Sequence, residues 1–196
     1  MHNAHQPSKK KSIIREWVEA IIVALILAFF VRVFFFEFYK IPTGSMIPTL
    51  MPGDRILVSK IIFGPRIPFV GVRMPGLRVP RRGEVIVFIS PAEKNKSYVK
   101  RVIGLPGEEV EIKFGSIYIN GAEIADQNIV KNYYYNYGEY GAEGASLKIP
   151  ERAYFVLGDN SASSRDSRFW GFAPSGDILG KAILIWWPPQ RIRMIE

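Results

Sequence analysis

The feature that most constrains this chain is a long apolar segment near its start, at residues 17–39. Residues 20–31 carry no polar side chain, and Arg32 is the first charge that follows them. A helix that spans a bilayer needs about 20 mostly apolar residues, which this segment supplies if the long Arg32 side chain reaches toward the membrane interface. We therefore expect one uncleaved transmembrane helix at 17–39, followed by a separate domain at 40–196.

Two other interpretations of this segment are a helix lying in the membrane interface and a cleavable leader. A leader requires small residues at a cleavage site after the apolar run, whereas residues 34–38 are Phe-Phe-Phe-Glu-Phe. Basic residues precede the segment, at 9–11 and at Arg15, within a polar tail that covers residues 1–16. Basic flanks favour the cytoplasmic side of a membrane, so we expect a cytoplasmic tail and an extracytoplasmic domain.

The net charge of +8 is compatible with binding to nucleic acid or to an anionic membrane surface. No recognised nucleic-acid motif accompanies the charge, and several basic residues lie near the apolar segment. Attraction to anionic lipids is the simpler explanation, so we expect a lipid bilayer as partner and no nucleic acid. The acidic residues do not gather at metal-ligand spacings and no nucleotide or haem motif occurs, so we expect no metal and no cofactor.

A candidate nucleophile, Ser45, lies in a turn-prone stretch just after the apolar segment. Pro42 and Pro48 restrict the backbone on either side of it, and Gly44 allows another backbone to approach closely. A rigidly held serine of this kind suits nucleophilic catalysis, but its hydroxyl reacts only when a nearby base removes the proton. The chain must therefore supply a base for Ser45.

The choice of base follows largely by elimination. The two histidines, His2 and His5, precede the apolar segment and cannot reach Ser45 if that segment spans a membrane, and there is no cysteine. A lysine remains, as in Ser-Lys proteases, and Lys100 lies between Tyr98 and Val102 on one face of an expected strand. Apolar surroundings would lower its pKa from about 10.4 toward neutrality. Spacing alone does not distinguish this pair from an ordinary loop serine and a surface lysine.

Short apolar runs separated by turn signals predict strands in the rest of the chain. The expected strands cover residues 56–62, 84–90, 97–103, 109–114, 116–119, 122–124, 153–157 and 178–187. Asn120-Gly121 is a typical hairpin turn between two of them. Residues 63–82 form either a solvated loop or a loop that faces membrane or substrate, and residues 126–147 form a long surface excursion whose tyrosines pack or contact substrate. These patterns predict a mainly β domain.

Four short blocks follow one another along this domain. They are residues 43–50 (Thr-Gly-Ser-Met-Ile-Pro-Thr-Leu), 53–58 (Gly-Asp-Arg-Ile-Leu-Val), 100–108 (Lys-Arg-Val-Ile-Gly-Leu-Pro-Gly-Glu) and 158–168 (Gly-Asp-Asn-Ser-Ala-Ser-Ser-Arg-Asp-Ser-Arg). In this order they resemble the type I signal peptidases, which are membrane-anchored Ser-Lys proteases that remove leader peptides from exported proteins. The resemblance implies an antiparallel β-sheet catalytic domain of the signal-peptidase type preceded by one N-terminal transmembrane helix.

The resemblance also implies roles for individual residues. Ser45 would be the nucleophile and Lys100 the general base, with the Thr43 hydroxyl and the Ser45 N–H as oxyanion donors and Ser164 orienting the lysine. Threonine at position 43 replaces the family's serine, and Ser161 stands where the family often has arginine. These two departures concern the oxyanion donors and the last block rather than the Ser-Lys pair.

Two further groups of residues are expected around the site: two ion pairs, which the charged residues themselves suggest, and a set of pocket residues, which the resemblance implies. The pairs Asp159–Arg101 and Asp166–Arg168 would brace the site as surface ion pairs, each worth under about 1 kcal/mol. Small apolar pockets beside Ser45 would select small side chains on the substrate. Their expected lining is Tyr39, Ile41, Pro42, Met46, Leu50, Ile56, Tyr98 and Val99.

The expected function is a serine endopeptidase of the bacterial cytoplasmic membrane that removes signal peptides from secretory preproteins after an Ala-x-Ala pattern. A self-cleaving Ser-Lys domain of the repressor type is a second enzymatic reading, although the apolar anchor argues against it. A different class of reading is an inactive, membrane-tethered β-domain that binds export substrates or partners. Such a module has no need of Ser45, Lys100 and Ser164 together.

Overall fold

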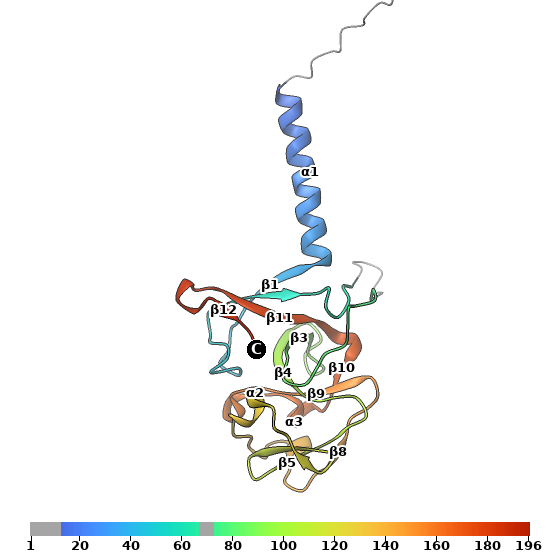
Figure 1. The fold of residues 1–196 in the computed structure, drawn as a ribbon, viewed down its shortest axis with the longest axis vertical. Helices are drawn as coiled ribbons and strands as arrows, with labels where there is room; N and C mark the ends of the chain where they lie inside the picture. Colours follow the sequence, from blue (N-terminus) through green and yellow to red (C-terminus); the bar gives the residue numbers. More distant parts are fainter. Residues whose placement is uncertain (1–12, 67–72) are drawn as a thin grey trace, which may run out of the picture.

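The computed structural model describes residues 13–66 and 73–196, which form a long helix followed by a β domain (Figure 1). The strands are β1 (Phe36–Lys40), β2 (Arg55–Ser59), β3 (Val85–Ile89), β4 (Ser97–Gly104), β5 (Glu109–Lys113), β6 (Ser116–Ile119), β7 (Ala122–Glu123), β8 (Leu147–Lys148), β9 (Ala153–Leu157), β10 (Ala173–Pro174), β11 (Ile178–Trp187) and β12 (Arg193–Met194). The helices are α1 (Ile13–Phe34), α2 (Gln127–Val130) and α3 (Ser167–Trp170), and four single 3₁₀ turns lie at 139–141, 161–163, 175–177 and 189–191.

The strands form two antiparallel sheets. The larger has the order β1-β2-β11-β3-β4-β9-β10 with β12 added at β11, and the smaller has the order β7-β6-β5-β8. Most of the expected strands are present, and the domain is mainly β as predicted. Apolar side chains of β4 and β9 pack with those of β5 and β6, so the core is continuous from one sheet to the other.

The hairpins of the smaller sheet follow from their turn residues. Asn120 and Gly121 both have positive φ, at 52° and 81°, as a tight two-residue hairpin turn requires. Phe114 and Gly115 do the same at the preceding turn, with φ of 52° and 80°. The predicted Asn-Gly turn is therefore confirmed between β6 and β7.

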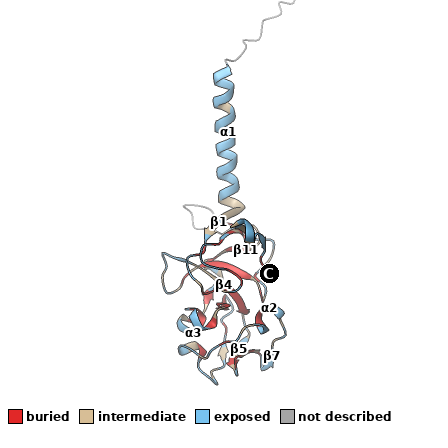
Figure 2. Cartoon of the chain, turned by 90° about the vertical axis from the view of Figure 1, so that its left-hand side faces the viewer, coloured by how far each residue is buried: buried red, intermediate tan, exposed pale blue. Residues whose placement is uncertain are grey.

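Helix α1 presents its apolar residues to the outside rather than to the domain. No residue of the helix is buried, and Figure 2 shows it as exposed along almost its whole length. Within the described residues it is the one helix long and apolar enough to cross a membrane. An apolar surface that no protein covers fits a membrane-spanning segment.

The end of this helix differs from the sequence interpretation, which extended the apolar segment to Tyr39. The helix stops at Phe34, and the next residues form β1, which pairs along its whole length with β2 from Phe36↔Ser59 to Lys40↔Arg55. Aromatic residues favour strands when a partner is available, and hydropathy alone does not reveal the partner. Most of the expected basic tail, 1–16, lies outside the described residues.

The junction between helix and sheet is held by Lys60, which follows β2. Its backbone N–H donates to the Phe35 carbonyl at 2.9 Å, and its ammonium donates to the Arg32 carbonyl at 3.2 Å. The same ammonium pairs with Glu37 at 2.9 Å. A lysine at the carboxyl end of a helix satisfies carbonyls that lack an intrahelical partner. The helix is therefore attached to the sheet by more than the connecting chain.

The excursion at 126–147 packs more closely than a surface loop. Tyr134 is buried in the core that lies between the two sheets, whereas Tyr133, Tyr135 and Tyr137 are partly exposed and contact one another. Of these four tyrosines, Tyr134 is the one that packs in the core. In the 63–82 segment, Arg66 and Arg73 pair as a β-bridge that closes the described ends of the loop.

Candidate active site

The candidate nucleophile lies in the connection between β1 and β2. Two hydrogen bonds tie the base of this connection: Ile41 N–H donates to the Asp54 carbonyl and Gly53 N–H to the Ile41 carbonyl, both at 2.8 Å. Met46 and Leu50 point into the main core and are almost fully buried. The apolar residues after Ser45 thus anchor the loop in the core, while the Ser45 hydroxyl contacts Lys100.

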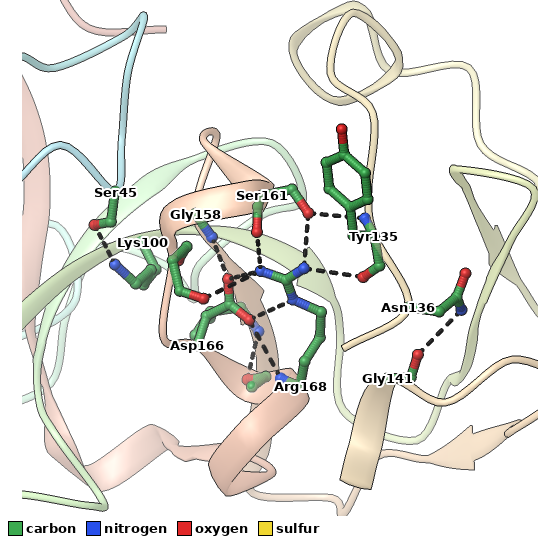
Figure 3. A network of polar contacts seen from close by, with 12 residues as sticks. Ser45, Lys100, Tyr135, Asn136, Gly141, Gly158, Ser161, Asp166 and Arg168 are labelled. Atoms are coloured by element: carbon green, nitrogen blue, oxygen red, sulfur yellow. Dashed lines mark hydrogen bonds and ion pairs between the residues drawn. The ribbon is translucent and has the colours of Figure 1, made fainter. Parts of the chain in front are cut away.

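Ser45 and Lys100 meet as the sequence predicts. Their Oγ and Nζ atoms lie 2.5 Å apart, and both residues are buried, with Lys100 4% exposed (Figure 3). Lys100 comes from β4, between β3 and β9 in the larger sheet, and its ammonium lies 5.8 Å from the centre of the Tyr98 ring. The geometry is that of a hydroxyl and a base within direct proton-transfer distance.

The surroundings of Lys100 favour its neutral form. Burial is the main cause, and it lowers the pKa of Lys100 from 10.5 to about 8. The carboxylates of Asp166 and Asp159 oppose this shift, while the Arg168 guanidinium adds to it. Because the aspartates are themselves paired with arginines, the desolvation of the lysine outweighs their attraction.

Two pairs of buried charges brace the site. Arg101 binds Asp159 through two hydrogen bonds of 2.7 and 2.8 Å, and Arg168 binds Asp166 through two of 2.8 and 2.9 Å. All four side chains are completely buried, which corrects the expectation of surface pairs. In the interior, loss of one partner leaves a charge without compensation, so these pairs matter much more than exposed ones.

Arg168 joins the last sequence block to the 126–147 excursion. Its guanidinium donates to the Tyr135 carbonyl at 2.9 Å and to the Ser161 hydroxyl at 2.7 Å, and Figure 3 shows it enclosed by these groups and Asp166. The Ser161 hydroxyl also accepts from Tyr135 N–H at 2.9 Å. Ser161, a position that departs from the family pattern, therefore connects two segments distant in sequence.

Ser164 does not occupy the position expected of it. Its hydroxyl is buried and has no hydrogen-bond partner among the described residues, so it does not bind Lys100 in this structure. The Oγ atom lies instead against Gly158. The sequence motif placed Ser164 in the loop that follows β9. It did not reveal the direction of the Ser164 side chain, because that direction depends on the turn at 161–163.

A cavity of about 800 Å³ opens beside the Ser45–Lys100 pair. Five of the eight expected pocket residues line it, namely Tyr39, Ile41, Pro42, Tyr98 and Val99. The exposed Thr43 lines it as well. The other three, Met46, Leu50 and Ile56, are buried in the core behind the wall, so they support the cavity without facing it.

The rim of the cavity carries charges that the sequence analysis missed. Lys96 and Arg165 lie there together with Glu93. Glu93 is paired with Lys96 and accepts a hydrogen bond from the Tyr98 hydroxyl at 2.6 Å. Glu93 and Lys96 come from the β3–β4 turn, which no motif marks, whereas Arg165 lies within the last matched block.

Thr49 and Asn160 also connect the nucleophile loop to neighbouring segments, and neither was singled out from the sequence. The Thr49 hydroxyl donates to Asp159 at 2.5 Å and accepts from Arg101 at 3.2 Å. Asn160 donates to the carbonyls of Gly44 and Ser45, each at 3.1 Å. Both residues lie within the matched blocks, and this position was the feature of the sequence that could have identified them.

Gly158 marks the closest approach between the last block and the nucleophile loop. A Cβ atom added there would lie 2.4 Å from the Ser45 carbonyl oxygen and 2.2 Å from the Ser164 Oγ. We expect Gly158→Ala to push the Ser45 backbone away from Lys100, lower kcat by at least about tenfold, and destabilise the domain by about 1–3 kcal/mol. Peptide cleavage and urea unfolding measure the two effects.

A matched control for this substitution is Gly176→Ala, because a Cβ atom at Gly176 meets no atom within 4 Å. The control is expected to retain both activity and stability. If Gly158→Ala behaves like Gly176→Ala, the close approach at Gly158 is not required for the site.

The chain matches the family model described as "Signal peptidase, peptidase S26" over residues 14–187, and it therefore belongs to this family of hydrolases. The relatives that it resembles are bacterial signal peptidases. It is 36% identical to the probable signal peptidase I-2 of Synechocystis sp., over 97% of this chain and 83% of the relative. It is 37% identical to signal peptidase I of Bacillus licheniformis, over 96% of this chain and 97% of the relative.

Among solved structures, a signal peptidase I from Enterococcus faecalis is 35% identical to this chain. The match covers 54% of this chain and 98% of that one, with a TM-score of 0.45. The family model and the bacterial relatives confirm the resemblance seen in the four sequence blocks and the expectation of an enzyme.

Proposed function

We propose that this protein is a membrane-bound serine endopeptidase that removes N-terminal signal peptides from exported preproteins, with Ser45 as nucleophile and Lys100 as general base. The observation that carries the proposal is the buried 2.5 Å contact between these two side chains at the wall of a cavity. The membership of the chain in the signal peptidase family supplies the substrate class.

The proposed reaction has two halves that use the same lysine. Neutral Lys100 takes the proton of the Ser45 hydroxyl as Oγ attacks the scissile carbonyl carbon, and the resulting ammonium protonates the leaving amine. An acyl-enzyme remains on Oγ. Lys100 then removes a proton from water, which attacks the ester, and returns that proton to Oγ as the ester bond breaks. The enzyme is restored to its starting state, and no cofactor is needed.

Two donors are proposed for the negative oxygen of the tetrahedral intermediate. The first is the backbone N–H of Ser45, and the second is the hydroxyl of Thr43, which lines the cavity. Donors that are already in place stabilise developing charge without reorganisation. The methyl group of Thr43 restricts its χ1 angle, so fewer orientations of the hydroxyl compete with the productive one.

The proposed specificity is for small side chains at the first and third positions before the cut, the Ala-x-Ala pattern of export signals. The cavity walls next to Ser45 carry Ile41 and Val99, which are apolar, and Tyr98, whose ring lies over the lysine. The Tyr98 hydroxyl is held by Glu93, so the ring has a fixed position. Ser164 remains a proposed orienting residue for the lysine, although its hydroxyl makes no hydrogen bond among the described residues.

The proposed location is the bacterial cytoplasmic membrane, crossed once by α1. The basic tail would lie in the cytoplasm and the β domain on the extracytoplasmic side, where Ser45 meets a substrate that is itself held by the membrane. The bacterial origin of the similar signal peptidases supports this location. The lipid bilayer and the signal peptides of preproteins are then the partners.

The test is a pH profile of peptide cleavage by the detergent-solubilised full chain, using a substrate with an Ala-x-Ala site. Because the base must be neutral and burial lowers the pKa of Lys100 to about 8, kcat/KM should rise through about pH 8. Below that value the neutral fraction, and with it the rate, should fall about tenfold per pH unit. A flat profile from acid to neutral pH would contradict Lys100 as the base.

Substrate binding by Ser45→Ala, followed over the same pH range, is the control that separates titration of the base from changes in affinity. Retention of cleavage in Ser45→Ala would overturn the proposed nucleophile. Binding by a folded wild-type protein that does not cleave would instead favour the non-catalytic β-domain.

A further inference from the structure

Asn160 contacts the nucleophile loop without forming part of the cavity wall. Its side-chain amide donates to the Gly44 carbonyl at 3.1 Å, and its backbone N–H donates to the Ser45 carbonyl at 3.1 Å. Asn160 is half-buried and does not line the cavity. A single residue thus holds the two carbonyl groups that flank the serine.

The bond to Gly44 also fixes the direction of the Ser45 N–H. The Gly44 carbonyl and the Ser45 N–H belong to one peptide unit, which is planar and, in this structure, trans. In a trans peptide these two groups point in opposite directions. When Asn160 holds the carbonyl on its own side, the N–H is therefore aimed away from Asn160.

The peptide before Ser45 is one that needs such support. Glycine permits backbone angles that other residues avoid, so a peptide next to Gly44 can rotate at low cost. A rotation would replace the N–H donor by a carbonyl oxygen, which repels a developing negative charge. The Gly44 carbonyl also accepts from Ile47 N–H at a longer 3.2 Å, so Asn160 shares the task with the turn itself.

We propose that Asn160 is a positioning residue for the oxyanion site: its side-chain amide holds the Gly44–Ser45 peptide so that the Ser45 N–H faces the reacting carbonyl oxygen. This inference rests on the proposed function, because it requires Ser45 to be the nucleophile. Asn160 itself touches neither the substrate nor Lys100. Its effect is expected on the charged tetrahedral intermediate rather than on substrate binding, because the uncharged carbonyl of the substrate binds the Ser45 N–H only weakly.

The test uses Asn160→Leu, which keeps the approximate shape of the side chain and removes its donor. In the full chain in detergent, we expect kcat to fall about 10- to 100-fold with little change in KM. This decrease in kcat is no larger than the decrease that follows removal of an oxyanion donor itself. The midpoint of the pH profile should stay unchanged, because the surroundings of Lys100 are not altered.

A peptide aldehyde with the substrate sequence distinguishes positioning from general damage. The Ser45 Oγ adds to the aldehyde carbon as its proton passes to Lys100, and the former carbonyl oxygen, which receives the electron pair of the C=O π bond, occupies the oxyanion site. We expect the inhibition constant of the aldehyde to rise by the same factor by which kcat/KM falls. Substrate affinity measured in a Ser45→Ala background should be the same with and without the Asn160→Leu substitution.

The matched control is Asn136→Leu. Like Asn160, Asn136 holds two backbone carbonyls, those of Ile112 and Gly141, but it binds both through its side-chain amide. It lies in the part of the domain remote from Ser45 (Figure 3). This control should lose stability while kcat and aldehyde inhibition stay as in the wild type. If Asn160→Leu does not fold, Asn160→Asp replaces it, because aspartate has the same shape and also lacks the amide donor. This variant is assayed above the pKa of Lys100, where the lysine is neutral in both the variant and the wild type.

Two results would overturn the inference: kinetics for Asn160→Leu that match those of Asn136→Leu, or a fall in kcat/KM without weaker aldehyde binding. In both cases the wild type still cleaves, so the proposed function stands. Absence of cleavage by the wild type, or activity in Ser45→Ala, would instead refute the proposed function.

Discussion

Replacing Lys100 by methionine is expected to lower kcat by about a thousandfold or more, because no other described side chain lies within bonding distance of the Ser45 hydroxyl. The same substitution should stabilise the protein. A buried lysine whose pKa is lowered from 10.5 to about 8 destabilises the folded state by about 3 kcal/mol when it is protonated. Methionine has a similar length and carries no charge.

The pH dependence of this stabilisation follows from the direction of the shift. Below about pH 8 the lysine is protonated in both the folded and unfolded states, so the wild type carries the full penalty. Between about pH 8 and 10.5 the folded form loses its proton first, and the difference between Lys100→Met and wild type should shrink. Urea unfolding at pH 7 and near pH 10 measures it, alongside peptide cleavage.

Lys148→Met is the matched control, since Lys148 is exposed on β8. It should keep full activity and change stability by less than about 0.5 kcal/mol. An inactive Lys100→Met that is also less stable than wild type would show that Lys100 has a structural role rather than a catalytic one. An active Lys100→Met would exclude it as the base.

Replacing Arg101 by methionine is expected to have the largest effect on stability, a loss of about 3–5 kcal/mol. The guanidinium is completely buried and bonds to Asp159, Thr49 and the carbonyls of Gly83 and Glu196. Without it the Asp159 carboxylate would be buried with only neutral donors. For a domain of this size the loss corresponds to a decrease in Tm of roughly 6–20 °C.

The charge explanation is tested by adding Asp159→Asn to Arg101→Met. Removing the stranded carboxylate should recover part of the lost stability, which a double-mutant cycle measures directly. Arg66→Met, which breaks the partly exposed Arg66–Asp177 pair, is the control and should cost under about 1 kcal/mol. If Arg101→Met costs no more than Arg66→Met, the buried pair does not stabilise the domain.

Much of the fold could be predicted because its signals are local. The runs that form β3, β9 and β11 are apolar and bounded by turn residues, and the Asn120-Gly121 turn has a single common geometry. Residues 36–39, which form most of β1, were assigned to the helix instead, because their pairing with β2 depends on chain that follows later. Hydropathy does not encode a partner strand.

The candidate site shows the same division between residue identity and geometry. The meeting of Ser45 and Lys100 was predicted by elimination of other bases and by matched blocks, and the structure brings them together. The directions of Met46, Leu50 and Ser164 were not predictable, because each depends on how a loop turns against the core. Burial of the two ion pairs likewise depends on packing between segments that lie far apart in sequence.

The direct passage from helix to sheet has a consequence for which bonds the active site can reach. Only Phe35 separates α1 from β1, Lys60 ties both sides of that junction, and β1 runs on to Tyr39 and Lys40 at the cavity wall. With α1 in a bilayer, the proposed nucleophile Ser45 would be held at a fixed height above the lipid. The site would then select a peptide bond by the distance of that bond from the membrane as well as by the substrate side chains beside it.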